Sequence, residues 1–357
     1  MPVFRPTADC IWNSFRSSGK RHLILTGGRG SGKTTLLAQL FPEQRPGLIT
    51  WAEPGKAVYL KETDTDAVVQ IGKFDPTLPG EENRMAPCSE AFLTLGIPAL
   101  ERCMCGESEW VTIDEIGYLE SACPEYQKDL CTLMERKRLA AVVRKQELPF
   151  LRDLCSRGDS FVVDLDDPFG EIGCVIMASG MGRRFGGNKL MADFRGTPMI
   201  CRALDATEGI FSNRVVVTRH EAVANLCRER GVEVAFHDLP HRSDTVRLGL
   251  ERMAGMDGCM FCAGDQPLLR RETVAALALA AAEDRQAIWR AAFEENEGLP
   301  VLFPKWSFPE LLTLPEGKGG GVVIQKYPHR LRRVKVEDPY ELKDVDTREE
   351  LLELLER

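Results

Sequence analysis

A glycine-rich loop at residues 27–34 constrains the fold of this chain more than any other feature. It reads Gly-Gly-Arg-Gly-Ser-Gly-Lys-Thr and fits the pattern G-x-x-x-x-G-K-[ST], between an apolar run and a helical pattern. Glycines let successive backbone N–H groups turn toward a phosphate, and the helix N-terminus adds partial positive charge. We therefore expect ATP or GTP to bind here. The predicted nucleotide-binding residues are Gly27, Gly30, Gly32, Lys33, Thr34 and Thr35.

An acidic strand end supplies the partner that such a loop requires. Residues 110–115 read Trp-Val-Thr-Ile-Asp-Glu, an apolar strand that ends in two carboxylates. The Thr34 hydroxyl and Asp114 are predicted to hold Mg²⁺, and Glu115 is predicted to polarise an attacking water. For Glu115, a solvated or helix-capping carboxylate is the open alternative.

A second glycine loop, at residues 176–190, carries positive charge. Gly180 and Gly182 allow close approach of the backbone to a triphosphate, and Arg184 and Lys189 bring cations to the same loop. No Gly-Lys-Thr follows, so this is not a second loop of the first kind. Such an arrangement suits attack on an α-phosphate with pyrophosphate leaving, because the basic residues neutralise the leaving group.

Asp265 lies eighty residues further on, where an apolar strand ends in Gly264-Asp265. A carboxylate at the carboxyl end of a parallel strand faces the ligand crevice of an open α/β sheet. Asp265 is therefore a predicted Mg²⁺ ligand, and a turn-capping role is its alternative.

Charge and cysteine content exclude several classes of partner. Against 46 Lys and Arg stand 54 Asp and Glu, a net charge of −8 that is unfavourable for binding nucleic acid. The longest near-continuous apolar run, 274–282, is far shorter than the roughly 20 residues that span a bilayer. Twelve cysteines are scattered through apolar segments with no secretory signal before them. We expect a cytoplasmic protein with reduced thiols and without a nucleic-acid or membrane partner.

The order of apolar runs and helical patterns predicts two α/β domains. At about 150 residues per domain the length favours two, and an acidic stretch with Pro and Gly at 164–170 marks the boundary. We expect domains over 1–169 and 170–357, each a doubly wound, mainly parallel sheet covered by helices. Strands are predicted at 23–26, 57–61, 110–114, 139–144 and 160–165, and then at 173–178, 214–218, 232–236, 258–263 and 331–336.

The first domain resembles P-loop nucleoside-triphosphatases of the cancer-related type. Residues 25–36 and 113–120 carry this resemblance, which extends loosely over 22–165. It implies an NTP-hydrolysing domain. A small P-loop protein beside a molybdopterin nucleotidyltransferase is also similar to the GTP-binding adaptor of guanine-dinucleotide cofactor assembly, which is the second interpretation.

The second domain resembles the MobA-like nucleotidyltransferase superfamily, and within it the molybdenum cofactor cytidylyltransferases. The blocks that carry the resemblance are 177–186, 188–190, 243–250, 264–268, 298–303, 317–320 and 344–347. The resemblance implies a Rossmann-like domain that transfers CMP from CTP to molybdopterin cofactor and releases pyrophosphate. The pair Ala178-Ser179 is nearer to the cytidylyl-type Ala-Ala-Gly than to the guanylyl-type Gly-Gly, which favours CTP over GTP.

The same resemblance implies roles for individual residues. Ala178 and Gly180, with the loop that includes Gly182, form the cradle for base and phosphates. Arg184 and Lys189 clamp the triphosphate, and Asp265 holds Mg²⁺. Further family positions are Ser243 and Arg247 near the nucleotide, and Asp346 or Asp344 as a second carboxylate.

The sequence thus predicts a fused enzyme, a P-loop NTPase followed by a nucleotidyltransferase. Its expected partners are nucleotides, a phosphorylated acceptor of the molybdopterin type and a molybdoenzyme that receives the cofactor. Two alternatives remain open. One is a guanylyltransferase with a GTP-binding adaptor domain, and the other is a nucleotidyltransferase acting on another phosphorylated acceptor.

Overall fold

The computed structural model describes residues 4–78 and 84–357 and divides into two compact units. One unit, here called the P-loop unit, spans Gly19–Asp167. The other, here called the C-terminal unit, comprises Pro168–Arg357 together with the N-terminal helix α1 (Ala8–Ser18). The division falls inside the acidic stretch 164–170. Sequence order alone would place α1 in the first domain, whereas the structure packs it on the C-terminal unit.

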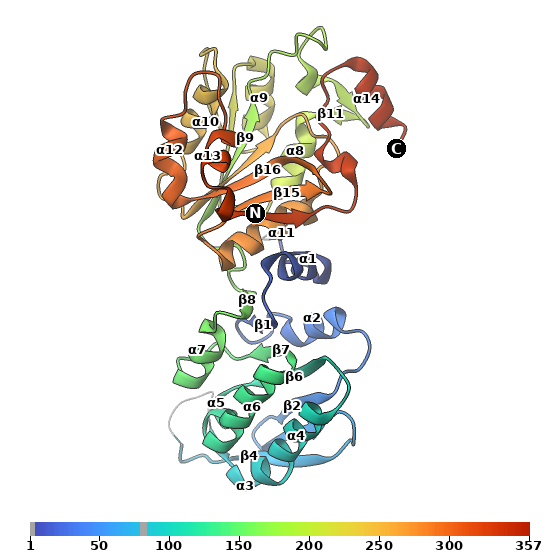
Figure 1. The fold of residues 1–357 in the computed structure, drawn as a ribbon, viewed down its shortest axis with the longest axis vertical. Coiled ribbons are helices and arrows are strands. Elements are labelled where there is room, and N and C mark those ends of the chain that lie inside the picture. Colours follow the sequence, from blue (N-terminus) through green and yellow to red (C-terminus); the bar gives the residue numbers. More distant parts are fainter. Residues whose placement is uncertain (1–3, 79–83) are drawn as a thin grey trace. The chain divides into compact units, whose positions relative to one another are not determined.

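An eight-stranded sheet forms the centre of the P-loop unit, in the order β5-β4-β3-β2-β6-β7-β1-β8 (Figure 1). Strands β2, β6, β7, β1 and β8 run parallel, and β3, β4 and β5 continue the sheet in antiparallel fashion. The strands are β1 (His22–Thr26), β2 (Gly47–Glu53), β3 (Ala57–Glu62), β4 (Val68–Phe74), β5 (Met85–Pro87), β6 (Trp110–Ile116), β7 (Arg138–Val143) and β8 (Ser160–Asp164).

Helices of this unit bury apolar stripes against the sheet. In α6, which begins at Pro124, buried Tyr126, Leu130 and Leu133 recur at the spacing of one helical face. The helices are α2 (Lys33–Leu40), α3 (Ser89–Ala91), α4 (Ile97–Cys105), α5 (Tyr118–Ser121), α6 (Pro124–Arg136) and α7 (Pro149–Ser156), with a π-helical turn at Phe92–Gly96. Because β1, β6 and β7 are parallel neighbours, their carboxyl ends meet at one edge of the sheet.

A seven-stranded sheet forms the centre of the C-terminal unit, in the order β13-β12-β9-β14-β16-β15-β17. Only the β14–β16 and β15–β16 pairs are antiparallel. The strands are β9 (Ile172–Ala178), β12 (Asn213–Thr218), β13 (Glu233–Phe236), β14 (Gly258–Ala263), β15 (Ile288–Phe293), β16 (Asn296–Pro304) and β17 (Leu331–Lys335), with a separate hairpin of β10 (Asp193–Phe194) and β11 (Thr197–Pro198).

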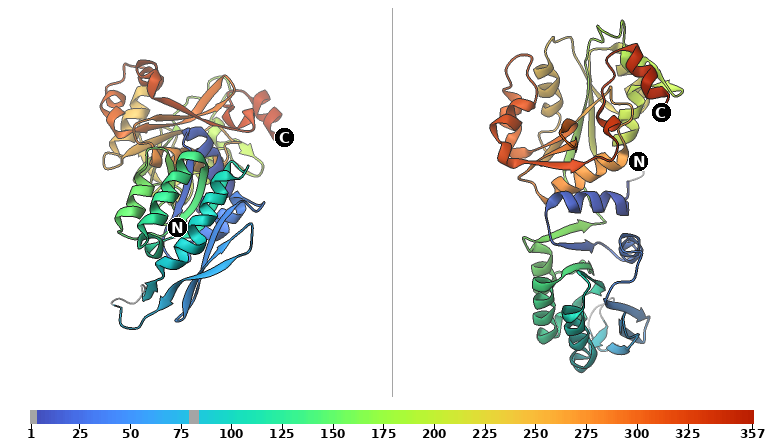
Figure 2. Two further views of the ribbon diagram at one scale, coloured as in Figure 1. Left: turned by 60° about the horizontal axis from the view of Figure 1, so that its bottom comes forward. Right: turned by 45° about the vertical axis from the view of Figure 1, so that its right-hand side comes forward.

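Helices cover both faces of this second sheet. Figures 1 and 2 show α10 and α12 on one face and α8 and α11 on the other. Val175, Val217 and Phe261 point toward the α10 side, where they pack with Val246 and Leu250 of that helix. The α-helices are α8 (Ile200–Thr207), α9 (Glu221–Glu229), α10 (Arg242–Glu251), α11 (Arg271–Glu283), α12 (Phe308–Leu312), α13 (Gly321–Lys326) and α14 (Arg348–Leu355), and short 3-10 turns lie at Lys189–Met191, Lys305–Ser307, Pro328–Arg330 and Pro339–Leu342.

Helix α1 packs on α11 and β17 through an apolar face that includes buried Ile11 and Phe15. Polar side chains of α1 fix the contact. Ser14 Oγ donates to the Ala276 carbonyl oxygen at 2.7 Å, and Asn13 Nδ2 donates to the Lys335 carbonyl oxygen at 2.8 Å. The sequence analysis did not predict α1, and the amphipathic pattern of this helix does not specify which sheet it covers.

The predicted fold class is confirmed: the chain contains two mainly parallel α/β sheets, and each of the ten predicted strands is present with ends shifted by at most two residues. The sequence analysis missed strands β2, β4, β5, β15 and β16, several of which continue the sheets in antiparallel fashion, and the short hairpin strands β10 and β11. Several side chains of β2 and β4 are exposed. These two strands therefore lack the continuous apolar run that is typical of a central strand. Within the described ranges, every helix is too short or too polar to cross a membrane.

Candidate active sites in the two units

The loop between β1 and α2 has the backbone geometry of a phosphate cradle. Gly27, Gly30 and Gly32 all have positive φ angles, of 140°, 78° and 95°. Residues other than glycine rarely adopt this backbone conformation. Lys33 opens α2, and its Nζ donates to the carbonyl oxygens of Gly27 at 2.8 Å and Gly28 at 2.6 Å. Burial lowers the pKa of the Lys33 ammonium, although neighbouring carboxylates oppose that shift. Thr34 and Thr35 follow in the first turn of α2 and are both exposed.

Thr34 and Asp114 meet across the edge of the sheet. Thr34 Oγ1 donates to Asp114 Oδ1 at 3.1 Å, although 80 residues separate them. Burial raises the pKa of Asp114, and the Thr34 hydrogen bond counteracts it. A hydroxyl beside a carboxylate at the mouth of a phosphate loop is the donor pair that Mg²⁺ takes when phosphates and water complete its shell. These two residues therefore fit the predicted ion.

Glu115 leaves the regular strand. Its φ is +90°, and the β6–β7 register shifts between Asp114 and Ile116. The bulge redirects the side chain, which forms an ion pair with Arg144. The next turn is fixed by the fully buried Glu120, which accepts from the Gly117 backbone N–H at 2.7 Å and whose pKa burial raises to about 7.

The sequence analysis missed two charged residues at this edge. Asp166 accepts from the Gly28 N–H through both carboxylate oxygens, at 2.9 and 3.0 Å, and pairs with Lys145 at 3.2 Å. Arg144 is the second, at the end of β7. Asp166 contacts Gly28, 138 residues away in the chain, and Arg144 contacts Glu115, 29 residues away. No local motif therefore predicts either contact.

The corresponding loop of the C-terminal unit begins where β9 ends. The Thr218 hydroxyl donates to the Ala178 carbonyl oxygen at 2.8 Å, and the Ser179 hydroxyl donates to the Val217 carbonyl oxygen at 3.0 Å. Ser179 Oγ also lies 2.8 Å from His237 Nε2, another residue that the sequence analysis missed. Burial lowers the pKa of His237, and Arg219 lowers it further. Neighbouring strand ends thus hold the start of the loop in place.

Gly182 is required by the fold of the loop. Its φ is +57°, and a Cβ built on it would lie 2.2 Å from the Gly187 carbonyl oxygen. The loop therefore closes on itself here, with Phe185 and Gly186 both donating to the Gly182 carbonyl oxygen at 3.1 Å. A substitution at this position would force the basic part of the loop to move.

Lys189 lies at the centre of a charged cluster that contains four of the predicted residues. The side chain is 7% exposed, and its Nζ lies 2.6 Å from Asp265 Oδ2 and 2.8 Å from Asp346 Oδ1. Arg184 pairs with the other oxygen of Asp346 at 2.5 Å. Burial alone would lower the pKa of Lys189, but the two carboxylates outweigh it and the pKa is raised. Lys189 in turn holds the pKa of Asp346 below its usual range.

Asp344 is a third carboxylate beside this cluster. Burial, aided by the charge of Asp265, raises its pKa to about 6. The described residues contain no preassembled group of three or more His, Cys, Asp or Glu ligands. Mg²⁺ commonly takes one or two protein carboxylates and fills its shell with phosphates and water, so Asp265 and Asp346 fit that requirement.

Ser243 and Arg247 lie on α10, but the described residues show no hydrogen bond from either side chain to the loop 178–189. Ser243 is buried in the first turn of the helix. Arg247 pairs with acids of its own helix, Asp244 at 3.5 Å and Glu251 at 3.1 Å. Their predicted proximity to nucleotide stays a prediction.

A cavity of about 370 Å³ lies in the C-terminal unit, where its lining includes residues of α10, α12 and α13. Its walls combine charged side chains with apolar ones that include Met177, Phe261 and Phe303, from β9, β14 and β16. Two of its lining residues directly precede predicted nucleotide residues: Met177 precedes Ala178, and Arg242 precedes Ser243. The cavity thus contacts residues that flank predicted site residues in the chain, while its lining contains no residue of the loop 178–189.

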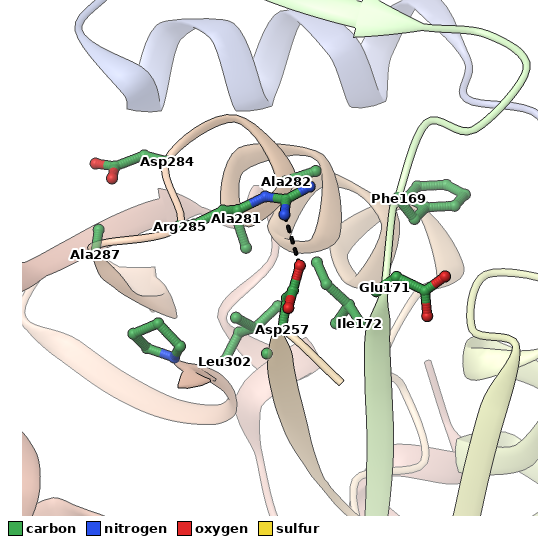
Figure 3. Close-up of a pocket in the computed structure, with 12 residues that line it drawn as sticks. Phe169, Glu171, Ile172, Asp257, Ala281, Ala282, Asp284, Arg285, Ala287 and Leu302 are labelled. Atoms are coloured by element: carbon green, nitrogen blue, oxygen red, sulfur yellow. Dashed lines mark hydrogen bonds and ion pairs between the residues drawn. The ribbon is translucent and has the colours of Figure 1, made fainter. Parts of the chain in front are cut away.

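A much smaller cavity, of about 10 Å³, lies at the opposite end of the same sheet (Figure 3). Its walls include Ile172 and Asp257, which start or precede β9 and β14, and Asp257 pairs with Arg285 at 2.6 Å. The strand starts and the strand ends lie a full strand length apart, so this cavity takes no part in the candidate site.

Comparison with known proteins finds a family model that matches part of each unit. Residues 55–168 match the family model described as NTPase, beginning after the glycine loop, and residues 174–333 match that of the MobA-like NTP transferase domain. No curated protein matches the chain.

Several solved structures are similar to parts of the chain. Rv0371c from Mycobacterium tuberculosis H37Rv is 24% identical, with 52% of this chain and 99% of that chain covered and a TM-score of 0.47. A nucleotidyl transferase from Methanothermobacter thermautotroptrophicus, Mth528, is 23% identical over 52% of this chain and 96% of that one, with a TM-score of 0.46. THEP1 from the hyperthermophile Aquifex aeolicus is 20% identical over 40% of this chain and 89% of that one, with a TM-score of 0.36. The two family models alone carry the broad assignment: the chain contains a region that matches an NTPase family, followed by one that matches the MobA-like NTP transferase domain.

Proposed function

We propose that the C-terminal unit transfers CMP from CTP to a phosphorylated acceptor of the molybdopterin type, and that the P-loop unit hydrolyses a nucleoside triphosphate. The observation that carries the transferase proposal is the cluster around Lys189. It gathers two cations and two carboxylates at the end of β9 and β14, beside a glycine loop. Nucleotidyl transfer needs this set, because positive charge must meet the departing pyrophosphate while carboxylates hold a metal.

The acceptor phosphate is the nucleophile in this reaction. It is already ionised at neutral pH, so no strong general base is required. An oxygen of the acceptor bonds to the α-phosphorus of CTP, and the bond from that phosphorus to the bridging oxygen of pyrophosphate breaks. Lys189 and Arg184 would turn from Asp265 and Asp346 toward the triphosphate. A bound Mg²⁺ would supply further charge neutralisation.

The direct test is pyrophosphate release from each of the four NTPs, with and without molybdopterin cofactor, with the product identified by mass. We expect release with CTP that depends on the acceptor, and a product heavier than the acceptor by one CMP unit. Release with GTP alone among the four would move the assignment to the guanylyl interpretation. If pyrophosphate release required some other phosphorylated acceptor, the proposed reaction type would stand and the proposed acceptor would be wrong.

Base choice is expected to depend on Ala178 and Ser179. Their side chains narrow the start of the loop relative to a pair of glycines, and the Ser179 hydroxyl is engaged with Val217 and His237. The structure thus favours a steric effect of Ser179 over a direct hydrogen bond to the base. One such difference is worth about 1–3 kcal/mol, or about ten- to two-hundred-fold in kcat/KM. We expect the double variant Ala178→Gly, Ser179→Gly to reduce the preference for CTP over GTP by about that factor. A wild-type preference for GTP would contradict this account.

The acceptor is proposed to enter the 370 Å³ cavity. Arg242 and Lys318 line it and form no ion pair with any carboxylate in the described residues, whereas Arg290 is paired with Glu297 at 2.7 Å. An acceptor with a ring system and a phosphate matches walls that combine apolar side chains with two unneutralised cations.

We expect Arg242→Ala to raise the KM for the acceptor about tenfold or more while the KM for CTP changes little, as steady-state kinetics would show. A charge-assisted hydrogen bond worth about 1.5–3 kcal/mol sets this scale. Arg252→Ala is the matched control, because Arg252 follows α10 at its other end and pairs with Glu233. An equal effect of both variants on the KM for the acceptor would contradict acceptor binding in this cavity.

Reduced thiols support a place in the cytoplasm as part of this proposal. All twelve cysteines are free, and Cys174 Sγ and Cys262 Sγ, which lie 3.9 Å apart, form a hydrogen bond rather than a disulfide. Thiols persist in reducing compartments. A molybdoenzyme that accepts the finished cofactor is the partner that the proposed product requires.

A further inference from the structure

Arg144 follows β7 at the edge of the sheet where the phosphate loop and the acidic strand end lie. In the sheet, β7 lies between β6 and β1 and is parallel to both. The register pairs Val142 with Leu25 on one side and with Asp114 on the other. Two residues further along, Arg144 is level with the start of the glycine loop, and its backbone N–H donates to the Ile116 carbonyl oxygen at 2.9 Å.

The side chain of Arg144 reaches across the acidic strand end. It pairs with Glu115 and packs over Gly117, where a Cβ would lie 2.9 Å from Arg144 Cδ. Any other residue at 117 would obstruct its path. The side chain is 38% exposed, so the guanidinium remains accessible to a ligand. Its charge also acts on Lys33, whose pKa it helps to lower.

We propose that Arg144 is a catalytic residue of the P-loop unit, an arginine supplied by the same chain that binds the γ-phosphoryl group as it is transferred to water. The inference rests on the proposed hydrolysis of a nucleoside triphosphate by this unit. It assigns to one residue the positive charge that NTPases of this kind obtain from their own chain or from a partner protein.

The ion pair between Arg144 and Glu115 links the catalytic role of Arg144 to the activation of water. Arg144 holds Glu115 in the free protein, and a γ-phosphate competes for the same guanidinium because it offers oxygens of higher charge. The exchange frees Glu115 to accept a proton from water. The water oxygen bonds to the γ-phosphorus, the bond to the β–γ bridging oxygen breaks, and the products are a nucleoside diphosphate and inorganic phosphate.

The first test compares Arg144→Ala with the unaltered full-length chain in NTP hydrolysis. We expect kcat to fall by about 10³-fold or more, the range found for arginines that contact the transferring phosphoryl group. The affinity for the uncleaved nucleotide should change much less, because the contact strengthens only in the transition state. Arg138→Ala is the matched control at the opposite end of the same strand, and Arg29→Ala tests the arginine inside the glycine loop. Hydrolysis by Arg144→Ala within threefold of the unaltered chain would overturn the inference, as would a 10³-fold loss confined to Arg29→Ala.

A trapping experiment separates contact with phosphate from an effect through Glu115. A nucleoside diphosphate with Mg²⁺ and aluminium fluoride mimics the transferring phosphoryl group, and we expect the unaltered chain and Glu115→Gln to retain it, but not Arg144→Ala. In kinetics, Glu115→Gln combined with Arg144→Ala should be much slower than Glu115→Gln alone. Equal rates, together with trapping by Arg144→Ala, would reduce Arg144 to a positioning residue and overturn the proposal. A chain that binds NTP and never hydrolyses it would instead refute the proposed NTPase activity itself.

Discussion

Asp265→Asn is expected to lower nucleotidyl transfer by about 10²–10⁴-fold while the chain stays folded. The substitution removes one of the two carboxylates that are placed to hold a divalent ion at the strand end, and it leaves Lys189 with the Asp346 carboxylate and the Val345 carbonyl oxygen as partners. A metal that orients the triphosphate and neutralises its charge contributes several kcal/mol to the transition state. Binding of CTP should weaken much less than turnover, because Lys189 and Arg184 still contact the triphosphate. Pyrophosphate release measured at saturating CTP reports the loss.

Asp257→Asn is the matched control for this prediction. Asp257 precedes the same strand β14 at its other end and also pairs with basic residues, Arg285 at 2.6 Å and Lys305 at 3.4 Å. Its exchange alters an ion pair but no residue of the proposed site. Near wild-type release by Asp265→Asn, or an equal loss in both variants, would return Asp265 to a turn-capping role.

Lys33→Ala is expected to reduce NTP hydrolysis by about 10³-fold or more and to leave nucleotidyl transfer within about twofold. The Lys33 ammonium is placed at the mouth of the loop, where it contacts two loop carbonyl oxygens, and a lysine at this position pairs with the terminal phosphates. The two glycine loops belong to separate compact units, so the loss should not spread to the transferase.

Lys56→Ala is the control for Lys33→Ala, since Lys56 is an exposed residue next to the β2–β3 turn of the same unit. Both activities are measured in the same sample, as inorganic phosphate and as pyrophosphate. Loss of both activities in Lys33→Ala, with Lys56→Ala unaffected, would contradict two independent sites.

Local sequence patterns predicted the parts of both sites that depend on few neighbours. The loop 27–34 is recognisable because its backbone conformation requires glycine at fixed positions, and Gly182 is required for the same reason. Asp114 and Asp265 could be predicted from the sequence, because a carboxylate that ends an apolar strand is a local signal. Its position in the sheet follows from the parallel topology. The contacts of Lys189 and Arg184 with Asp265 and Asp346 were not predicted, because up to 162 residues separate the partners. Asp346 was a candidate only through the family resemblance.

Partners from distant segments were not predictable. Arg144 looks like any cation after a strand until the bulge at Glu115 is known, and Asp166 looks like a residue of a linker. His237 meets Ser179 only because β13 and β9 flank the same strand, β12. In each case the missing information was the order of strands in the sheet. A strand order fixes which carboxyl ends are neighbours, and a single sequence states it only indirectly.

The antiparallel strands show a second kind of gap. β16 carries Gly298 and Pro300 within its length, residues that usually weaken a strand, yet it pairs on both sides with β14 and β15. Tertiary pairing overrides the local preference there. The same strand supplies Phe303 and Val301 to the cavity proposed for the acceptor. Because β16 was not predicted, the sequence did not indicate this part of the cavity wall.

Simultaneous measurement of inorganic phosphate and pyrophosphate from the full-length chain tests the central claim most directly. The chain, Lys33→Ala and Asp265→Asn are each incubated with CTP, ATP or GTP in the presence of molybdopterin cofactor. The account predicts that only Asp265→Asn loses CTP-dependent pyrophosphate and that only Lys33→Ala loses phosphate release. Pyrophosphate formation that survives Asp265→Asn, or that disappears in Lys33→Ala, would contradict it.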